Sequence, residues 1–152
     1  MAKQQELDSV YMGTALLHAK LSKARRNKVG AVLVTAQGAV LTGFNGTAIG
    51  RPNECEHLTM STAWGGMDQM VLTTKPEVIH AELNCILKAA REGVSCLGAT
   101  VYTSLSPCVP CAAMLVNAGI SRLVFKDTYR NTEGLQLLES CGILVEQFKE
   151  KE

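Results

Sequence analysis

The chain has 152 residues, 47% of them hydrophobic, and a formal net charge of +1. This length and composition suit one compact domain over residues 1–152, since no stretch resembles a linker or a repeat. The near-neutral charge and the small aromatic content argue against a broad nucleic-acid surface, and no apolar run approaches the roughly 20 residues of a membrane span.

The first residues, Met1 to Glu6, lack the apolar core of a secretory signal. The six cysteines are therefore interpreted as reduced thiols rather than a disulfide framework, with Cys85, Cys96 and Cys141 as small buried apolar residues. We expect a cytoplasmic location, which would be the host cytoplasm for a viral chain.

In the first half, apolar residues at helical spacing predict a helix from about residue 4 to residue 24. Residues 29–34 and 39–44 are rich in strand-forming side chains, and the four residues between them suit a hairpin turn. A long glycine-rich loop from Asn45 to Lys75 is expected to follow.

The second half alternates helices and strands. Ser106 suits an N-cap and Pro107 the first helical position, so a helix is expected from Pro107 to Gly119. The remaining elements are a helix opened by His80 and ending near Gly93, strands at 99–103, 122–125 and 143–148, and a helix at 132–140. This order predicts an α/β fold with a five-stranded mixed sheet between two helical layers, a three-layer α/β/α architecture.

His80-Ala81-Glu82 and Pro107-Cys108-Val109-Pro110-Cys111 are the motifs that carry chemistry. His80, Cys108 and Cys111 supply three ligands for one zinc ion, which leaves the fourth position open for water, as in catalytic sites. Two cysteines three positions apart at a helix start lie about 5–6 Å apart at Cβ, and the helix N-terminus favours their thiolate forms. Glu82 would then lie beside the water as a carboxylate that shuttles protons.

A CxxC pair alone would also suit a redox pair, half of a structural zinc site or chance. The combination of H-x-E with P-C-x-x-C is the known signature of nucleobase deaminases. The joint pattern therefore favours a deaminase.

The chain resembles the zinc-dependent cytidine/deoxycytidylate deaminase superfamily, most closely the deoxycytidylate (dCMP) deaminases, including those of phages. The resemblance rests on residues 29–32, 43–47, 53–56, 80–84, 103–108 and 118–120. It implies a cytidine deaminase-like fold and zinc-dependent hydrolysis of dCMP to dUMP and ammonia, which supplies the dTMP precursor. Phe44 and Ala48 replace the tyrosine and proline that relatives often carry, so dCTP and 5-substituted dCMP stay open as alternative substrates.

The resemblance also implies substrate contacts. The backbone N–H of Ala81 would meet the pyrimidine oxygen, and the carbonyl of Ser106 would meet the leaving amine. The amide of Asn45 would contact the 3′-hydroxyl of the deoxyribose. Glu82 would take a proton from water, give one to ring nitrogen 3 and protonate the leaving amine.

Two groups of residues are candidates for the 5′-phosphate site. Arg26 and Lys28 belong to a basic cluster at the end of the first predicted helix, although such clusters also serve as solvated helix ends. By resemblance, Tyr129 and Arg130 would close over the nucleotide, the alternative being a subunit-contact loop.

Residues 54–57, Glu-Cys-Glu-His, have ligand-like side chains, but their spacing matches no compact site. We therefore expect one catalytic zinc and no second zinc. The resemblance implies a homohexamer and an effector pocket in this loop, with dCTP as activator and dTTP as inhibitor, each able to carry Mg²⁺. The apolar segment from Trp64 to Leu72 is expected at a subunit interface.

Two other classes of function remain open. One is a nucleic-acid-editing deaminase of the same fold, such as a tRNA adenosine deaminase, whose polynucleotide affinity would fall steeply with salt. The other is a non-catalytic domain stabilised by zinc, in which Glu82 is incidental and metal removal unfolds the chain.

Overall fold

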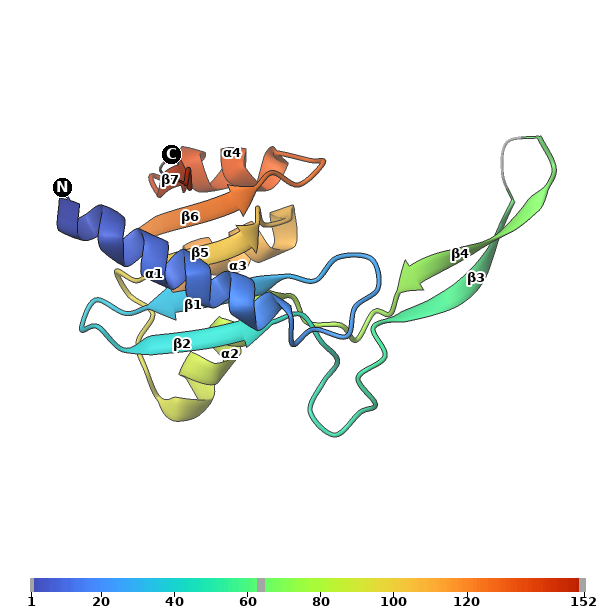
Figure 1. Ribbon diagram of the computed structural model, residues 1–152, viewed down its shortest axis with the longest axis horizontal. Helices are drawn as coiled ribbons and strands as arrows, with labels where there is room; N and C mark the ends of the chain where they lie inside the picture. Colours follow the sequence, from blue (N-terminus) through green and yellow to red (C-terminus); the bar gives the residue numbers. More distant parts are fainter. Residues whose placement is uncertain (1, 63–64, 151–152) are drawn as a thin grey trace.

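The computed structural model describes residues 2–62 and 65–150, in which one helix and four successive strands are followed by helices and strands that alternate (Figure 1). The first half contains α1 (Ala2–Ala19), β1 (Gly30–Val34), β2 (Val40–Phe44), β3 (Glu56–Thr62) and β4 (Asp68–Thr74). The second half contains α2 (Ala81–Glu92), β5 (Thr100–Leu105), α3 (Val109–Ala118), β6 (Arg122–Asp127), α4 (Glu133–Ser140) and β7 (Leu144–Gln147). None of the helices in these residues has the length and apolarity needed to cross a bilayer.

The main sheet has five strands in the order β2-β1-β5-β6-β7. β1 runs antiparallel to both β2 and β5, whereas β5, β6 and β7 are parallel and are connected through α3 and α4. Parallel neighbours need such crossover connections, which explains why each of these helices lies between two strands in the sequence. The prediction of a five-stranded mixed sheet is confirmed.

Helices cover both faces of this sheet (Figure 1). Successive strand residues point to opposite faces, so Leu33 and Val101 pack in the core beneath α2, α3 and α4, while Val32 and Tyr102 pack with Met12 of α1. Both clusters are almost completely buried. The predicted three-layer α/β/α architecture is therefore confirmed.

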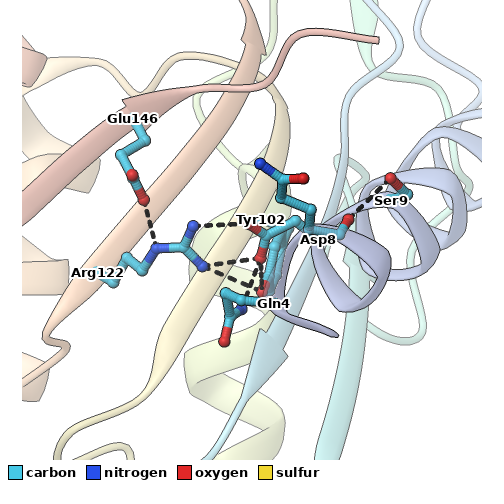
Figure 2. A network of polar contacts seen from close by, with 7 residues as sticks. Gln4, Asp8, Ser9, Tyr102, Arg122 and Glu146 are labelled. Carbon is cyan, nitrogen blue, oxygen red and sulfur yellow. Dashed lines mark hydrogen bonds and ion pairs between the residues drawn. The ribbon is translucent and has the colours of Figure 1, made fainter. Parts of the chain in front are cut away.

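A polar network fastens α1 to the sheet at Arg122 (Figure 2). The Arg122 guanidinium donates to both carboxylate oxygens of Asp8 and also pairs with Glu146, while the Tyr102 hydroxyl donates to Asp8 over 2.7 Å. The hydrogen bond from Arg122 is the largest cause that lowers the pKa of Asp8 to about 2, with a smaller contribution from Tyr102. The network therefore keeps Asp8 ionised and binds helix to sheet by charge as well as by packing.

The predicted end of the first helix was wrong, because α1 ends at Ala19 rather than near residue 24. The N–H groups of residues 20–22 donate to carbonyls three residues back instead of four, which tightens the last turn. The Ser22 hydroxyl then donates to the Asn45 carbonyl and turns the chain away from the helix. Cys141, expected to be buried, is exposed, whereas Cys85 is buried as predicted.

Part of the expected loop from Asn45 to Lys75 is instead an antiparallel hairpin, β3–β4, which we call the arm (residues 56–74). It projects away from the sheet, and within the described residues neither of its strands contacts another helix or strand (Figure 1). Met60 and Met70 face each other across the arm and are 64% and 56% exposed. Trp64, expected at a subunit interface, lies outside the described residues.

Candidate active site

Two helix starts bring the three predicted metal ligands together. His80 is the N-cap of α2, Cys108 is the N-cap of α3, and Cys111 lies in the first turn of α3. His80 Nδ1 lies 3.5 Å from Cys108 Sγ and 3.2 Å from Cys111 Sγ, and the three ligand atoms all lie within 4.8 Å of one another. The structure therefore gathers His80, Cys108 and Cys111 into one group that can hold a metal ion.

The donor set and its spacing fit zinc. With bonds of about 2.0 Å to nitrogen and 2.3 Å to sulfur, tetrahedral geometry puts a nitrogen and a sulfur ligand about 3.5 Å apart, close to the separations found between His80 and the two cysteines. Hydrogen bonds from Cys111 and then His80 lower the pKa of Cys108 to about 4, and the neighbouring Cys108 together with burial raises the pKa of Cys111. Of the two cysteines, Cys108 is therefore the thiolate beside His80, and thiolate is the form of cysteine that binds metal.

Two glycines allow the elements around this group to approach closely. A Cβ on Gly43 of β2 would lie 2.5 Å from the Ala81 carbonyl oxygen, so only glycine lets the start of α2 pack against this strand. A Cβ on Gly134 of α4 would lie 2.2 Å from the Pro107 carbonyl oxygen, next to Cys108. Close backbone packing therefore fixes both ligand-bearing helix starts.

Glu82 lies in the first turn of α2, lines the same cavity as His80 and Cys108, and is 3% exposed. Burial is the largest cause that raises the pKa of its carboxyl. The Thr103 hydroxyl lies 3.4 Å from Glu82 Oε1 but donates over a shorter 2.8 Å to the Leu105 carbonyl, so it offsets little of that shift. A carboxyl with a raised pKa in a cavity suits proton transfer near neutral pH.

The cavity also brings together several predicted substrate residues. Arg26, Asn45, Ser106 and Tyr129 line it, and Ala81, the first residue of α2, is completely buried beside it. N–H groups in the first helical turn have no acceptor within the helix, so the Ala81 N–H takes no part in the hydrogen bonds of α2. Two other candidates lie outside the lining: Lys28 is exposed, and the Arg130 guanidinium stacks 5.5 Å from the Tyr129 ring centre.

Asn45 holds the backbone at the cavity edge. Its Oδ1 accepts the Val29 N–H at 2.9 Å, and its Nδ2 donates to the Asn27 carbonyl at 2.8 Å. Each of these backbone groups would lose its partner if the side chain were removed. The amide of Asn45 therefore shapes the loop at residues 27–29 whatever else it binds.

Ser106 does not cap α3 as the sequence suggested. Its N–H donates to the Asp127 carbonyl, which continues the pairing of β5 with β6, and its hydroxyl accepts the Tyr129 N–H at 2.6 Å. Cys108 takes the N-cap position and Pro110 lies inside the first turn, so the helix starts two residues later than predicted. Ser106 instead positions the loop that carries Tyr129.

The base of the arm supplies cavity residues that the sequence analysis missed. Cys55, Glu56 and Thr74 line the cavity, whereas residues 54–57 were weighed from the sequence as ligands of a second metal and none of them was assigned to the substrate site. Glu54 points elsewhere and pairs with Lys75 at 3.7 Å. The only sequence signal was the position of Cys55 and Glu56 within the block of resemblance at 53–56.

A family model described as the cytidine and deoxycytidylate deaminase zinc-binding region matches residues 5–127. The chain belongs to this deaminase family. The family's defining region covers the His80, Cys108 and Cys111 group, so the metal site found by geometry is a zinc site of a deaminase domain.

Relatives of this deaminase span most of its length. A deoxycytidylate deaminase of Enterobacteria phage T4 is 34% identical, over 90% of this chain and 87% of its own. The deoxycytidylate deaminase of Saccharomyces cerevisiae is also 34% identical, over 93% of this chain but 44% of its own. Among solved structures, the dCMP deaminase of cyanophage S-TIM5 in complex with dCMP and dUMP is 34% identical, with a TM-score of 0.80 and coverage of 94% and 97%. The cytidine deaminase-like fold is thereby confirmed.

Proposed function

We propose that this deaminase hydrolyses dCMP to dUMP and ammonia. The observation that carries the proposal is the buried carboxyl of Glu82 in one cavity with the His80, Cys108 and Cys111 group. The 34% identity with the T4 deoxycytidylate deaminase and with the cyanophage enzyme bound to dCMP and dUMP supports this choice of substrate.

His80, Cys108 and Cys111 would hold the zinc ion. Zinc supplies Lewis acidity that brings the pKa of water down to about 7, so that a nucleophile is available at neutral pH. Glu82 accepts the proton released as oxygen adds to carbon 4 of the cytosine, and donates a proton to ring nitrogen 3. Glu82 then moves a second proton from the added oxygen to the amine, the carbon–nitrogen bond breaks, and ammonia leaves.

The remaining contacts orient the nucleotide. The free N–H of Ala81 donates to the pyrimidine oxygen, and the Ser106 carbonyl accepts from the leaving amine. Asn45, which lines the cavity and also holds the loop before β1, would contact the 3′-hydroxyl. For the 5′-phosphate, the cavity lining favours Arg26 and Tyr129, while Lys28 and Arg130 would have to move to take part.

The test is ammonia release from the zinc-loaded protein with cytidine, deoxycytidine, dCMP, dCTP, 5-methyl-dCMP and a tRNA substrate. We expect dCMP to have the highest kcat/KM. If kcat/KM is higher for dCTP, for the 5-substituted nucleotide or for tRNA adenosine, that compound and not dCMP is the substrate. If the protein binds zinc but releases ammonia from none of these compounds, it is a non-catalytic domain stabilised by zinc.

We further propose regulation by nucleoside triphosphates, dCTP as activator and dTTP as inhibitor, at a second cavity. This cavity has a volume of about 500 Å³ and lies beside the loop after β2. Arg51, Lys88 and Arg91 line it and supply positive charge for phosphates and their Mg²⁺. The test measures the rate of deamination at a fixed low concentration of dCMP, with and without each triphosphate. We expect dCTP to raise this rate and dTTP to lower it, and unchanged rates would refute regulation.

We also propose a homohexamer in the cytoplasm. A two-stranded hairpin alone is only marginally stable in water, so the exposed Met60 and Met70 of the arm favour cover by another subunit. The six free cysteines suit a reducing compartment. Sedimentation equilibrium gives the mass in solution, and a monomer would contradict the assembly.

A further inference from the structure

The loop between α1 and β1 carries Arg26 to the cavity and is held from two sides. On one side, Asn45 bonds to the backbone of residues 27 and 29. On the other, the Glu56 carboxylate accepts the Arg25 N–H at 2.9 and 3.0 Å and the Arg26 N–H at 3.0 Å. One carboxylate thus binds two successive backbone N–H groups of this loop.

Glu56 also stands at the base of the arm. It is paired in register with Thr74, whose hydroxyl accepts a hydrogen bond from Arg26 Nη1 at 3.4 Å. The Lys75 N–H donates to the Cys55 carbonyl at 2.8 Å, so the hairpin pairing continues into the body at this point. The base of the arm therefore holds Arg26 twice, through its backbone by Glu56 and through its side chain by Thr74.

This arrangement leaves the charge of Arg26 available. The Glu56 carboxylate is directed at backbone N–H groups, and in residues 2–62 and 65–150 no ion pair involves the Arg26 guanidinium. A guanidinium without an acidic partner at a cavity keeps its donors for a planar two-point contact with phosphate oxygens. The Glu56 carboxylate, by contrast, already accepts charge-assisted hydrogen bonds from the backbone of Arg25 and Arg26.

We propose that Glu56 is a positioning residue for the 5′-phosphate: by holding the backbone of Arg25 and Arg26, it aims the Arg26 guanidinium into the cavity and makes the arm part of the nucleotide site. This inference rests on the proposed function, because it assigns the phosphate of the same substrate. It concerns binding of the phosphate and not the chemical step at the base.

The experiment compares wild type, Glu56→Gln, Glu56→Ala and Arg26→Ala in kinetics with dCMP. Calorimetry then measures the affinities of dUMP and deoxyuridine, which differ only in the phosphate. Loss of charge-assisted hydrogen bonds should raise the KM for dCMP about tenfold or more, with kcat changed by less than about threefold. The ratio of dUMP to deoxyuridine affinity should fall by a similar factor, and Glu56→Gln should add nothing in an Arg26→Ala background.

Glu54→Gln is the matched control, since Glu54 is a neighbouring glutamate that does not line the cavity. Equal loss of affinity for dUMP and deoxyuridine in the Glu56 variants would reduce Glu56 to a general structural role and overturn the proposal. Tighter dUMP binding by Glu56→Gln would show that the carboxylate repels phosphate, which also overturns it. If Glu56→Ala does not fold, Glu56→Gln and Glu56→Asp still give the affinity ratio. Failure of wild type to deaminate dCMP would refute the proposed function separately, because the ratio needs no turnover.

Discussion

Asp8 and Arg122, more than a hundred residues apart in the chain, form two parallel hydrogen bonds of 2.8 and 2.7 Å that join α1 to the sheet (Figure 2). Their side chains are only 14% and 16% exposed. A two-point pair of this kind is stronger than a surface salt bridge, because each bond is charge-assisted and little water reaches it. The pair lies outside the active-site cavity, so its effect on stability can be separated from catalysis.

Asp8→Asn should lower the free energy of unfolding by about 2–3 kcal/mol at pH 7, because it leaves the Arg122 guanidinium with Glu146 as its remaining acidic partner. Urea unfolding followed by circular dichroism measures the change. Ser9→Ala, on the exposed side of the same helix, is the control and should change stability by less than about 0.5 kcal/mol. Equal stability of Asp8→Asn and wild type would show that packing alone holds α1.

The same carboxylate should make stability depend on pH in the acid range. The folded-state pKa of Asp8 is lowered from 3.8 to about 2, so its contribution is present above about pH 4 and is lost as the pH falls toward 2. The difference in unfolding free energy between wild type and Asp8→Asn should therefore shrink over this interval. Metal loss in acid affects both proteins and cancels in the difference. A difference that stays constant from pH 4 to pH 2 would contradict the lowered pKa.

Glu82→Gln should retain zinc and lose activity by about 10²–10⁴-fold, because the amide keeps the shape of the side chain but carries no transferable proton. Ammonia release gives the rate, and atomic absorption gives the zinc content. Glu92→Gln at the exposed end of the same helix should keep normal activity. Full turnover by Glu82→Gln would remove Glu82 from the mechanism, whereas zinc loss would make it a metal-site residue.

Cys111→Ser should lose most of the zinc that wild type holds at about one ion per chain, because two remaining protein ligands bind zinc much more weakly than three. Wild type should lose thermal stability when a chelator is added, and the variant should not respond. Cys141→Ser, at an exposed cysteine, is the control and should keep its zinc. Unchanged zinc content in Cys111→Ser would place the metal elsewhere.

The metal site could be predicted almost completely from the sequence. His80, Cys108 and Cys111 have side chains whose chemistry is specific, and local sequence signals put each of them close to the start of a helix, although packing sets where α3 begins. Glu82, two residues after His80 in the same helix turn, was predictable for the same reason. The strands of the sheet were predictable because apolar, β-branched runs bounded by turn residues are a local signal.

The arm was not predictable in this way. Its strands bury little against the rest of the described structure, so Leu58, Met60 and Met70 remain exposed and the alternation of buried and exposed residues that marks a strand is weak. The start of α3 was misplaced because Ser106 suits an N-cap locally, whereas pairing with β6 extends the strand through Ser106. In both cases tertiary contacts outweighed a local preference.

The sequence by itself therefore determined the group of three metal-binding side chains, the buried carboxyl of Glu82 next to them and the layers of the fold, because each depends on side-chain chemistry or on short-range periodicity. Only the tertiary structure decided which cation faces the cavity, that Glu56 of the arm holds Arg26, and that Asp8 meets Arg122. These contacts join residues about 30 to 114 positions apart, and their partners are set by how the elements pack, which no local pattern records.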